Sequence, residues 1–155
     1  MKKQEIQIDE IFHDKKKEGL REFISSQSAT QSKERLLTNK LLSIQYRLED
    51  YIRNENEDKE MLKILDFVKL YLKALNLTKK RLATYFEMED SNLHKYLSGE
   101  RKLNAEVALK LSAFTHTNPV YWYRVQLKNE LIALKKEKQK VAEYEKFDYR
   151  NLVEA

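Results

Sequence analysis

Cations cluster around residues 79 to 102, where they are well placed to bind phosphate. Lys79, Lys80 and Arg81 fall in the first turn of a predicted helix, and cations at a helix N-terminus oppose the helix dipole at a cost of about 0.3 to 1 kcal/mol each. This placement makes sense if an external anion lies there, and a phosphate group is the natural candidate. Arg101 and Lys102 extend the same surface. The alternative is that these exposed cations only keep the chain soluble.

The residues that must position this cluster predict two short helices joined by a tight turn. Thr78 is a suitable N-cap for the first helix, and Ser98 with Gly99 ends the second. The inward residues are Leu82, Ala83 and Phe86 on the first helix, Met88 in the turn, and Leu93 and Leu97 on the second. Ser91, Asn92 and Lys95 therefore point outward together, with His94 on one flank.

The chain lacks the residue types and spacings that most catalytic and metal-binding sites require. The chain has no cysteine, which excludes disulfides and zinc sites built on sulfur. His13, His94 and His116 are far apart, and two glycines 80 residues apart cannot form a glycine-rich phosphate loop. The acidic clusters lack the partners of a nuclease site. We therefore expect no metal, no cofactor and no enzymatic activity.

The pattern between residues 77 and 111 is more specific than any single motif. It consists of Leu77, Thr78, Leu82, Ala83, Phe86, Met88, Leu93, Leu97, Ser98, Gly99, Arg101, Lys102, Leu103, Ala108, Leu109 and Leu111. This pattern resembles the helix-turn-helix domain of the XRE (Cro and phage-repressor-like) family, a five-helix fold whose second motif helix lies in the DNA major groove. The resemblance implies that Ser91, Asn92 and Lys95 contact base edges. It implies phosphate contacts from Thr78, Lys79, Lys80, Arg101 and Lys102.

Two features depart from the family pattern. The family usually has glycine where this chain has Glu87, and a positive φ there would cost a glutamate roughly 1 kcal/mol. Glu89 and Asp90 begin the second motif helix, where they suit the helix N-terminus but would repel phosphates if they faced the duplex. Alternatively, one of these carboxylates accepts a hydrogen bond from cytosine N4 and contributes selectivity.

A second pattern follows the motif directly. Asn118 and Pro119 predict a helix start, and the spacing Asn118-Pro119-x-x-Trp122-x-x-x-Gln126 resembles the HigA antitoxin group. This resemblance implies a homodimer that represses its own operon and neutralises a HigB-like toxin, a small basic ribosome-dependent mRNA endonuclease. One alternative is a stand-alone XRE repressor of phage or mobile-element origin without a toxin. Another is a protein-binding module whose Glu89 and Asp90 have abolished DNA contact.

Apolar periodicity indicates an all-α protein in three parts. We expect an N-terminal helical segment over residues 1–57, the helix-turn-helix domain over 58–134, and a basic helical tail over 135–155. Stripes with spacings of four and three residues predict helices over about 33–53 and 58–75, and a polar stretch at 25–32 predicts a connection before the first of them. A long helix is expected from Pro119 onward.

Four expectations concern partner surfaces. Residues 1–55 are the favoured toxin-contact region, because their carboxylates would complement a basic ribonuclease; the alternative is that they complete the core. Leu127, Leu131 and Leu134 keep one side of the long helix apolar, so this helix is expected to supply the dimer contact. Trp122 is expected to be a core or dimer-interface anchor. The tail around Phe147 to Arg150 is either a docking segment or a helix that returns to its own domain.

Charge and hydropathy suggest a cytoplasmic protein with a polyanionic partner. The 155 residues carry 30 Lys and Arg against 25 Asp and Glu, a formal net charge of +5. Residues 1–60 have 12 cations and 13 anions, whereas residues 61–118 have 10 and 6, and residues 119–155 have 8 and 6. The excess of positive charge therefore lies with the predicted DNA-binding domain and the tail. No apolar run approaches the length of a membrane span.

Overall fold

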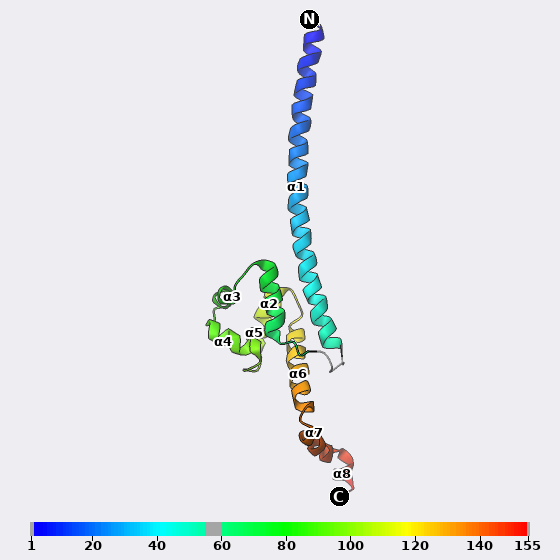
Figure 1. Cartoon of the computed structure of the whole chain (residues 1–155), viewed down its shortest axis with the longest axis vertical. Coiled ribbons are helices and arrows are strands. Elements are labelled where there is room, and N and C mark those ends of the chain that lie inside the picture. Colours follow the sequence, from blue (N-terminus) through cyan, green and yellow to red (C-terminus); the bar gives the residue numbers. More distant parts are fainter. Residues whose placement is uncertain (1, 55–59, 155) are drawn as a thin grey trace. The chain divides into compact units, whose positions relative to one another are not determined.

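The computed structural model describes residues 2–54 and 60–154, with side chains described from residue 15 onward. These residues contain helices and no strand, which confirms the all-α expectation. The elements are α1 (Lys2–Arg53), α2 (Ile64–Leu75), α3 (Lys79–Tyr85), α4 (Asp90–Ser98), α5 (Ala105–Thr115), α6 (Pro119–Lys135), α7 (Lys138–Tyr144), the 3₁₀ turn η1 (Glu145–Phe147) and α8 (Tyr149–Val153) (Figure 1). None of the described helices is both long and apolar enough to cross a membrane.

The chain divides into two units, residues 1–40 and residues 41–155. Residues 2–40 are helical throughout, so the connection expected at 25–32 is wrong. The stretch SSQSATQS contains neither glycine nor proline, and its residues each cost less than about 0.7 kcal/mol in a helix. Thr30 Oγ1 also donates a hydrogen bond to the Ser26 carbonyl at 3.0 Å, within the helix. Polarity alone is therefore not a reason for the helix to end.

The last turns of α1, from residue 41 to residue 53, belong to the second unit. Ile44, Leu48 and Tyr51 are buried there, as the four-three spacing predicts. The Tyr51 ring lies 5.7 Å from the Phe67 ring on α2, and the Tyr51 hydroxyl donates to Asn129 Oδ1 on α6 at 2.5 Å. Burial raises the pKa of the Tyr51 phenol. Residues 41–53 of α1 therefore complete the core of the second unit.

The second helix starts later than its apolar spacing predicts. The expected start at residue 58 lies outside the described residues, but residues 60–63 are not helical and α2 begins at Ile64. Asp66 explains the observed start, because its Oδ2 accepts a hydrogen bond from the Lys63 backbone N–H at 2.8 Å. Phe67, Val68, Tyr71 and Leu72 then form the buried face of α2.

The core of the second unit lies between α2, α4, α5 and α6. Its fully buried members include Phe67, Leu93, Leu97, Leu111, Trp122 and Val125. Two of these helices, α5 and α6, begin at the predicted caps. Asn104 Oδ1 accepts from Val107 N–H at 2.9 Å at the start of α5, and Asn118 Oδ1 accepts from Val120 N–H at 3.0 Å at the start of α6. Pro119 occupies the first turn of α6 as predicted.

The turn between α3 and α4 contains a glutamate in the left-handed region. Glu87 has φ +57°, so the strain described for a glutamate with positive φ at this turn position is present. The turn is held by hydrogen bonds from Glu87 N–H to Thr84 O at 3.1 Å and from Met88 N–H to Ala83 O at 2.9 Å. A side chain with a Cβ atom is strained at this φ. The strain is tolerated because the buried residues on both sides, Phe86 and Leu93, hold the two helices in place.

Replacing Glu87 with glycine should raise the free energy of unfolding by about 1 kcal/mol, because glycine adopts positive φ without a steric penalty. Glu100→Gly is the matched control, since Glu100 is exposed and does not have a positive φ. That change should be neutral or destabilising. Urea denaturation of both variants measures the difference, and equal behaviour of the two would contradict strain at Glu87.

Candidate nucleic-acid interface

Helices α3 and α4 form the predicted two-helix motif. Thr78 caps α3, with its Oγ1 accepting a hydrogen bond from Arg81 N–H at 3.2 Å. Leu82 and Ala83 are buried on α3, and Leu93 and Leu97 are buried on α4. Ala83 is 1% exposed, so a larger side chain there would push the helices apart. The sequence predicted this inner face correctly.

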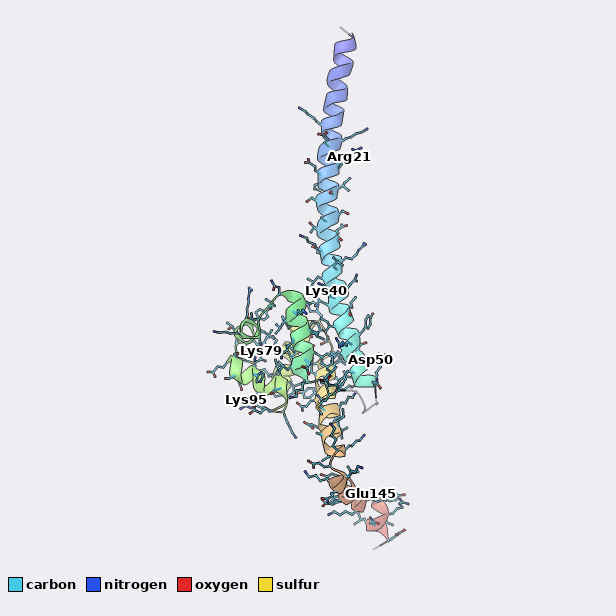
Figure 2. All side chains as sticks on the ribbon, in the orientation of Figure 1. Arg21, Lys40, Asp50, Lys79, Lys95 and Glu145 are labelled. Carbon is cyan, nitrogen blue, oxygen red and sulfur yellow. The ribbon has the colours of Figure 1, made fainter. Side chains whose placement is uncertain are left out.

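The opposite face of α4 presents the polar residues that were predicted to contact base edges. Ser91 and Lys95 are exposed, and Asn92 and His94 are half-buried. Lys79 and Lys95 lie on the two consecutive helices of the motif (Figure 2). Three side chains with hydroxyl, amide and ammonium groups are thus available on one short helix, which suits hydrogen bonding to base edges.

Lys79 lies between the two helices of the motif. Its Nζ is 2.9 Å from His94 Nδ1 and 3.8 Å from Asp90 Oδ1. The ammonium group therefore offsets part of the negative charge at the start of α4, which reduces the repulsion that Asp90 would exert on a phosphate. This role was not foreseen, because residues 79 and 94 are too far apart in sequence for helix spacing to connect them. Lys80, Arg81 and Glu89 are exposed.

The link after α4 holds the other two nominated cations. Gly99 ends the helix with φ +85°, and Arg101 N–H then donates to the Lys95 carbonyl at 3.0 Å. The Arg101 guanidinium turns back onto α4, where Nη1 donates to Asn92 Oδ1 at 2.6 Å and Cζ lies 5.4 Å from the centre of the Tyr96 ring. Lys102 is exposed. Arg101, which was predicted to contact phosphate, is therefore hydrogen-bonded to Asn92, which was predicted to contact a base.

Three residues that support α4 and the link after it were not predicted as site residues. Tyr96 is buried beneath Arg101, and its hydroxyl accepts from Asn104 Nδ2 at 3.2 Å. Gln126 Oε1 accepts from Leu103 N–H at 2.6 Å, which ties the link to α6. The resemblance included Gln126, but its chemical role could not be read from spacing. Trp122 is fully buried, as expected for a core anchor.

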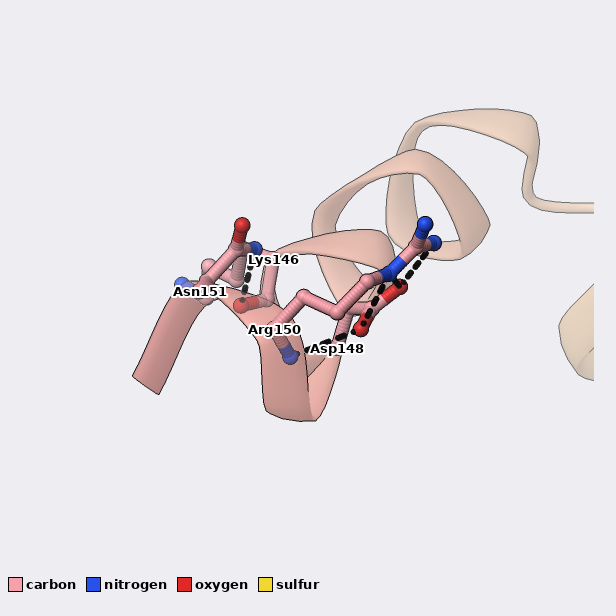
Figure 3. Close-up of polar contacts among 4 residues, drawn as sticks. All are labelled: Lys146, Asp148, Arg150 and Asn151. Carbon is pink, nitrogen blue, oxygen red and sulfur yellow. Dashed lines mark hydrogen bonds and ion pairs between the residues drawn. The ribbon is translucent and has the colours of Figure 1, made fainter. Parts of the chain in front are cut away.

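The C-terminal tail after α6 consists of α7, η1 and α8. Asp148 caps α8, accepting from the Arg150 backbone N–H at 2.9 Å, and its carboxylate also pairs with the Arg150 guanidinium at 2.7 Å (Figure 3). The hydrogen bonds from Arg150 lower the pKa of the Asp148 carboxyl. Phe147 and Tyr149 are 70% and 74% exposed. The nominated aromatic residues of the tail are thus exposed on short helical elements.

Metal-binding geometry is lacking in the part of the chain whose side chains are described. No group of three His, Asp or Glu residues there could hold a metal ion. His94 contacts Lys79, and His116 is exposed at the end of α5 with φ +55°. The side chain of His13 lies outside the described residues.

The structure thus brings together an exposed polar face of α4, cations beside it and buried leucines behind it. Comparisons of this chain with family models, with curated proteins and with solved structures found no match.

Proposed function

We propose that this protein binds double-stranded DNA through α3 and α4 and represses transcription. The observation that carries this proposal is the outward face of α4, with Ser91 and Lys95 exposed over a buried row that includes Leu93 and Leu97. Residues 61–118, which contain this face, have an excess of four cations. A helix of this kind enters the major groove, while neighbouring cations hold the phosphates.

The proposal predicts two separable effects on DNA binding. Lys102→Ala should weaken binding to all sequences and reduce the slope of log K against log salt by about 0.9, because one phosphate contact is lost. Asn92→Ala should chiefly relax sequence preference. Fluorescence anisotropy over a salt series, with selected and scrambled duplexes, measures both effects.

The matched control is Lys140→Ala on α7, where the ammonium is paired with Glu137 at 2.7 Å. It removes the same charge and should leave the salt slope unchanged. A salt slope that is equally insensitive to Lys102→Ala would contradict the phosphate assignment. Failure of the wild-type protein to bind any duplex would favour the alternative of a protein-binding module.

We place the contact of a homodimer on the outer side of α6. Val120, Tyr123, Leu127 and Leu131 are 46%, 37%, 54% and 44% exposed, and they recur at helical spacing. Such a stripe is typical of a protein interface. A dimer lets two α4 helices reach half-sites about 34 Å apart. Sedimentation equilibrium should give a dimer for the wild-type chain and a monomer for Leu131→Asp; a monomeric wild-type chain would contradict this placement.

The resemblance to HigA extends the proposal to an antitoxin that neutralises a HigB-like mRNA endonuclease. The observation that favours a protein partner is the set of exposed apolar side chains on residues 15–40, namely Leu20, Phe23, Ile24, Leu36 and Leu37. This stretch has seven cations and three anions, so its charge does not complement a basic toxin. Apolar contact must therefore supply the affinity for a basic toxin. The alternative is a repressor without a toxin.

Co-expression with the product of the adjacent gene tests the antitoxin proposal. Phe23→Asp should abolish co-purification because it places a charge within the apolar contact. Ser26→Asp, at an exposed polar position of the same helix, should leave co-purification intact. Capture that withstands Phe23→Asp would contradict this contact region, and no capture by the wild-type chain would favour the stand-alone repressor.

A further inference from the structure

We infer that Arg101 is a positioning residue that fixes Asn92 as a hydrogen-bond donor, so that this pair selects guanine in the DNA major groove. The inference rests on the proposed DNA-binding function and assigns a base to one of its contacts. It follows from the 2.6 Å hydrogen bond between Arg101 Nη1 and Asn92 Oδ1.

The orientation of the Asn92 amide is determined by the chemistry of its partner. A guanidinium group has five N–H donors and no acceptor. The atom of Asn92 that faces Arg101 must therefore be the oxygen, and the NH₂ group must lie on the other side of the amide. Without such a partner, the two ends of an asparagine amide could exchange places by rotation about the Cβ–Cγ bond.

Arg101 is itself held in place from two sides. Its backbone N–H donates to the Lys95 carbonyl at 3.0 Å, immediately after the left-handed turn at Gly99. Its guanidinium lies 5.4 Å from the centre of the buried Tyr96 ring, a distance typical of a cation–π contact. Because both supports belong to α4 and its C-terminal turn, the hydrogen bond to Asn92 is built into the helix that would enter the groove.

The fixed amide favours one base edge over the others. Guanine presents two acceptors in the major groove, N7 and O6, and both can take a hydrogen bond from an NH₂ group. Adenine presents one acceptor and one donor, so its usual pairing with asparagine requires a free amide oxygen. In this protein the amide oxygen already accepts a hydrogen bond from Arg101, which leaves it one lone pair and keeps it turned toward the guanidinium. We therefore expect guanine at the position read by Asn92, with a preference over adenine of roughly tenfold.

Selection of binding sites from a random duplex library tests the inference with four full-length proteins: wild type, Asn92→Ala, Arg101→Met and Lys102→Met. Asn92→Ala identifies the base position that depends on this side chain. Arg101→Met keeps an unbranched, although shorter, side chain and removes every N–H donor of the guanidinium, so preference at that position should move from guanine toward adenine. Lys102→Met removes the same charge from the same link, and it should lower affinity without changing any base preference.

Each result supports or overturns the inference. A shift of base preference in Arg101→Met but not in Lys102→Met supports it, provided that thermal melting shows both variants folded. Identical preferences in the two variants, with only affinity reduced, would overturn it and leave Arg101 as a phosphate contact. Adenine at the Asn92 position of the wild type would also overturn it. If the wild type selected no sequence at all, the proposed DNA-binding function would fail, and the inference with it.

Discussion

Leu48→Ala should lower the free energy of unfolding by about 2 to 5 kcal/mol, although the residue lies in a helix whose residues 2–40 belong to a separate unit. Leu48 has 0% exposed surface and belongs to the core that contains Phe67 and Trp122. The loss combines the transfer free energy of the removed methyl groups with the cavity that remains. It is a large part of the roughly 5 to 15 kcal/mol that stabilises an ordinary domain.

Leu36→Ala, three turns earlier in the same helix, is the matched control. Leu36 is 59% exposed, so its loss should change stability by less than about 0.5 kcal/mol. Urea denaturation followed by circular dichroism measures both variants. Equal effects of the two substitutions would mean that the end of α1 does not complete the core. The expected difference also means that a deletion intended to remove only the proposed toxin contact should stop at residue 40 and keep Ile44, Leu48 and Tyr51.

Trp122→Ala should lower the free energy of unfolding by about 3 to 5 kcal/mol. Trp122 is fully buried at the start of α6 and is among the largest buried side chains. Its truncation leaves a cavity at the centre of the core, between the elements that support α4. The proposed DNA binding should therefore fall together with stability, and it should recover at lower temperature as the folded fraction rises. Thermal melting and anisotropy on the same sample measure this coupling.

Trp122→Phe separates packing from hydrogen bonding at this position. The indole Nε1 is buried and has no hydrogen-bond partner among the described residues. Phenylalanine keeps most of the apolar ring and removes the unpaired N–H, which costs free energy when buried. The loss should be much smaller than for Trp122→Ala. A loss as large as that of alanine would mean that the indole N–H has a partner in solution.

Local signals in the sequence predicted much of the region from α3 to α6. Thr78, Asn104 and Asn118 cap the helices that they were expected to cap, and Gly99 ends α4. Caps and turns depend on residues within about four positions of one another, so their chemistry is readable from neighbouring residue types.

The sequence was less informative about where the helices begin and end when no strong cap or helix-breaking residue marks the position. The polar stretch at residues 25–32 suggested a connection, yet α1 continues through it. Helix propensities differ by less than 1 kcal/mol among such residues, so they do not decide where a helix ends. The start of α2 was also misplaced, because its apolar stripe extends back to Met61 whereas the helix begins only at Ile64, where Asp66 accepts from Lys63 N–H.

The amino-acid sequence by itself determined that the chain is helical, that a capped two-helix motif lies near residues 78 to 99, and which of its residues face inward, because helical periodicity and caps are local properties. Only the tertiary structure decided how the polar groups pair. Arg101 meets Asn92 across nine positions, and Lys79 meets His94 across fifteen. Such contacts depend on how a turn redirects the chain and how two helices cross, and a linear spacing does not contain that geometry.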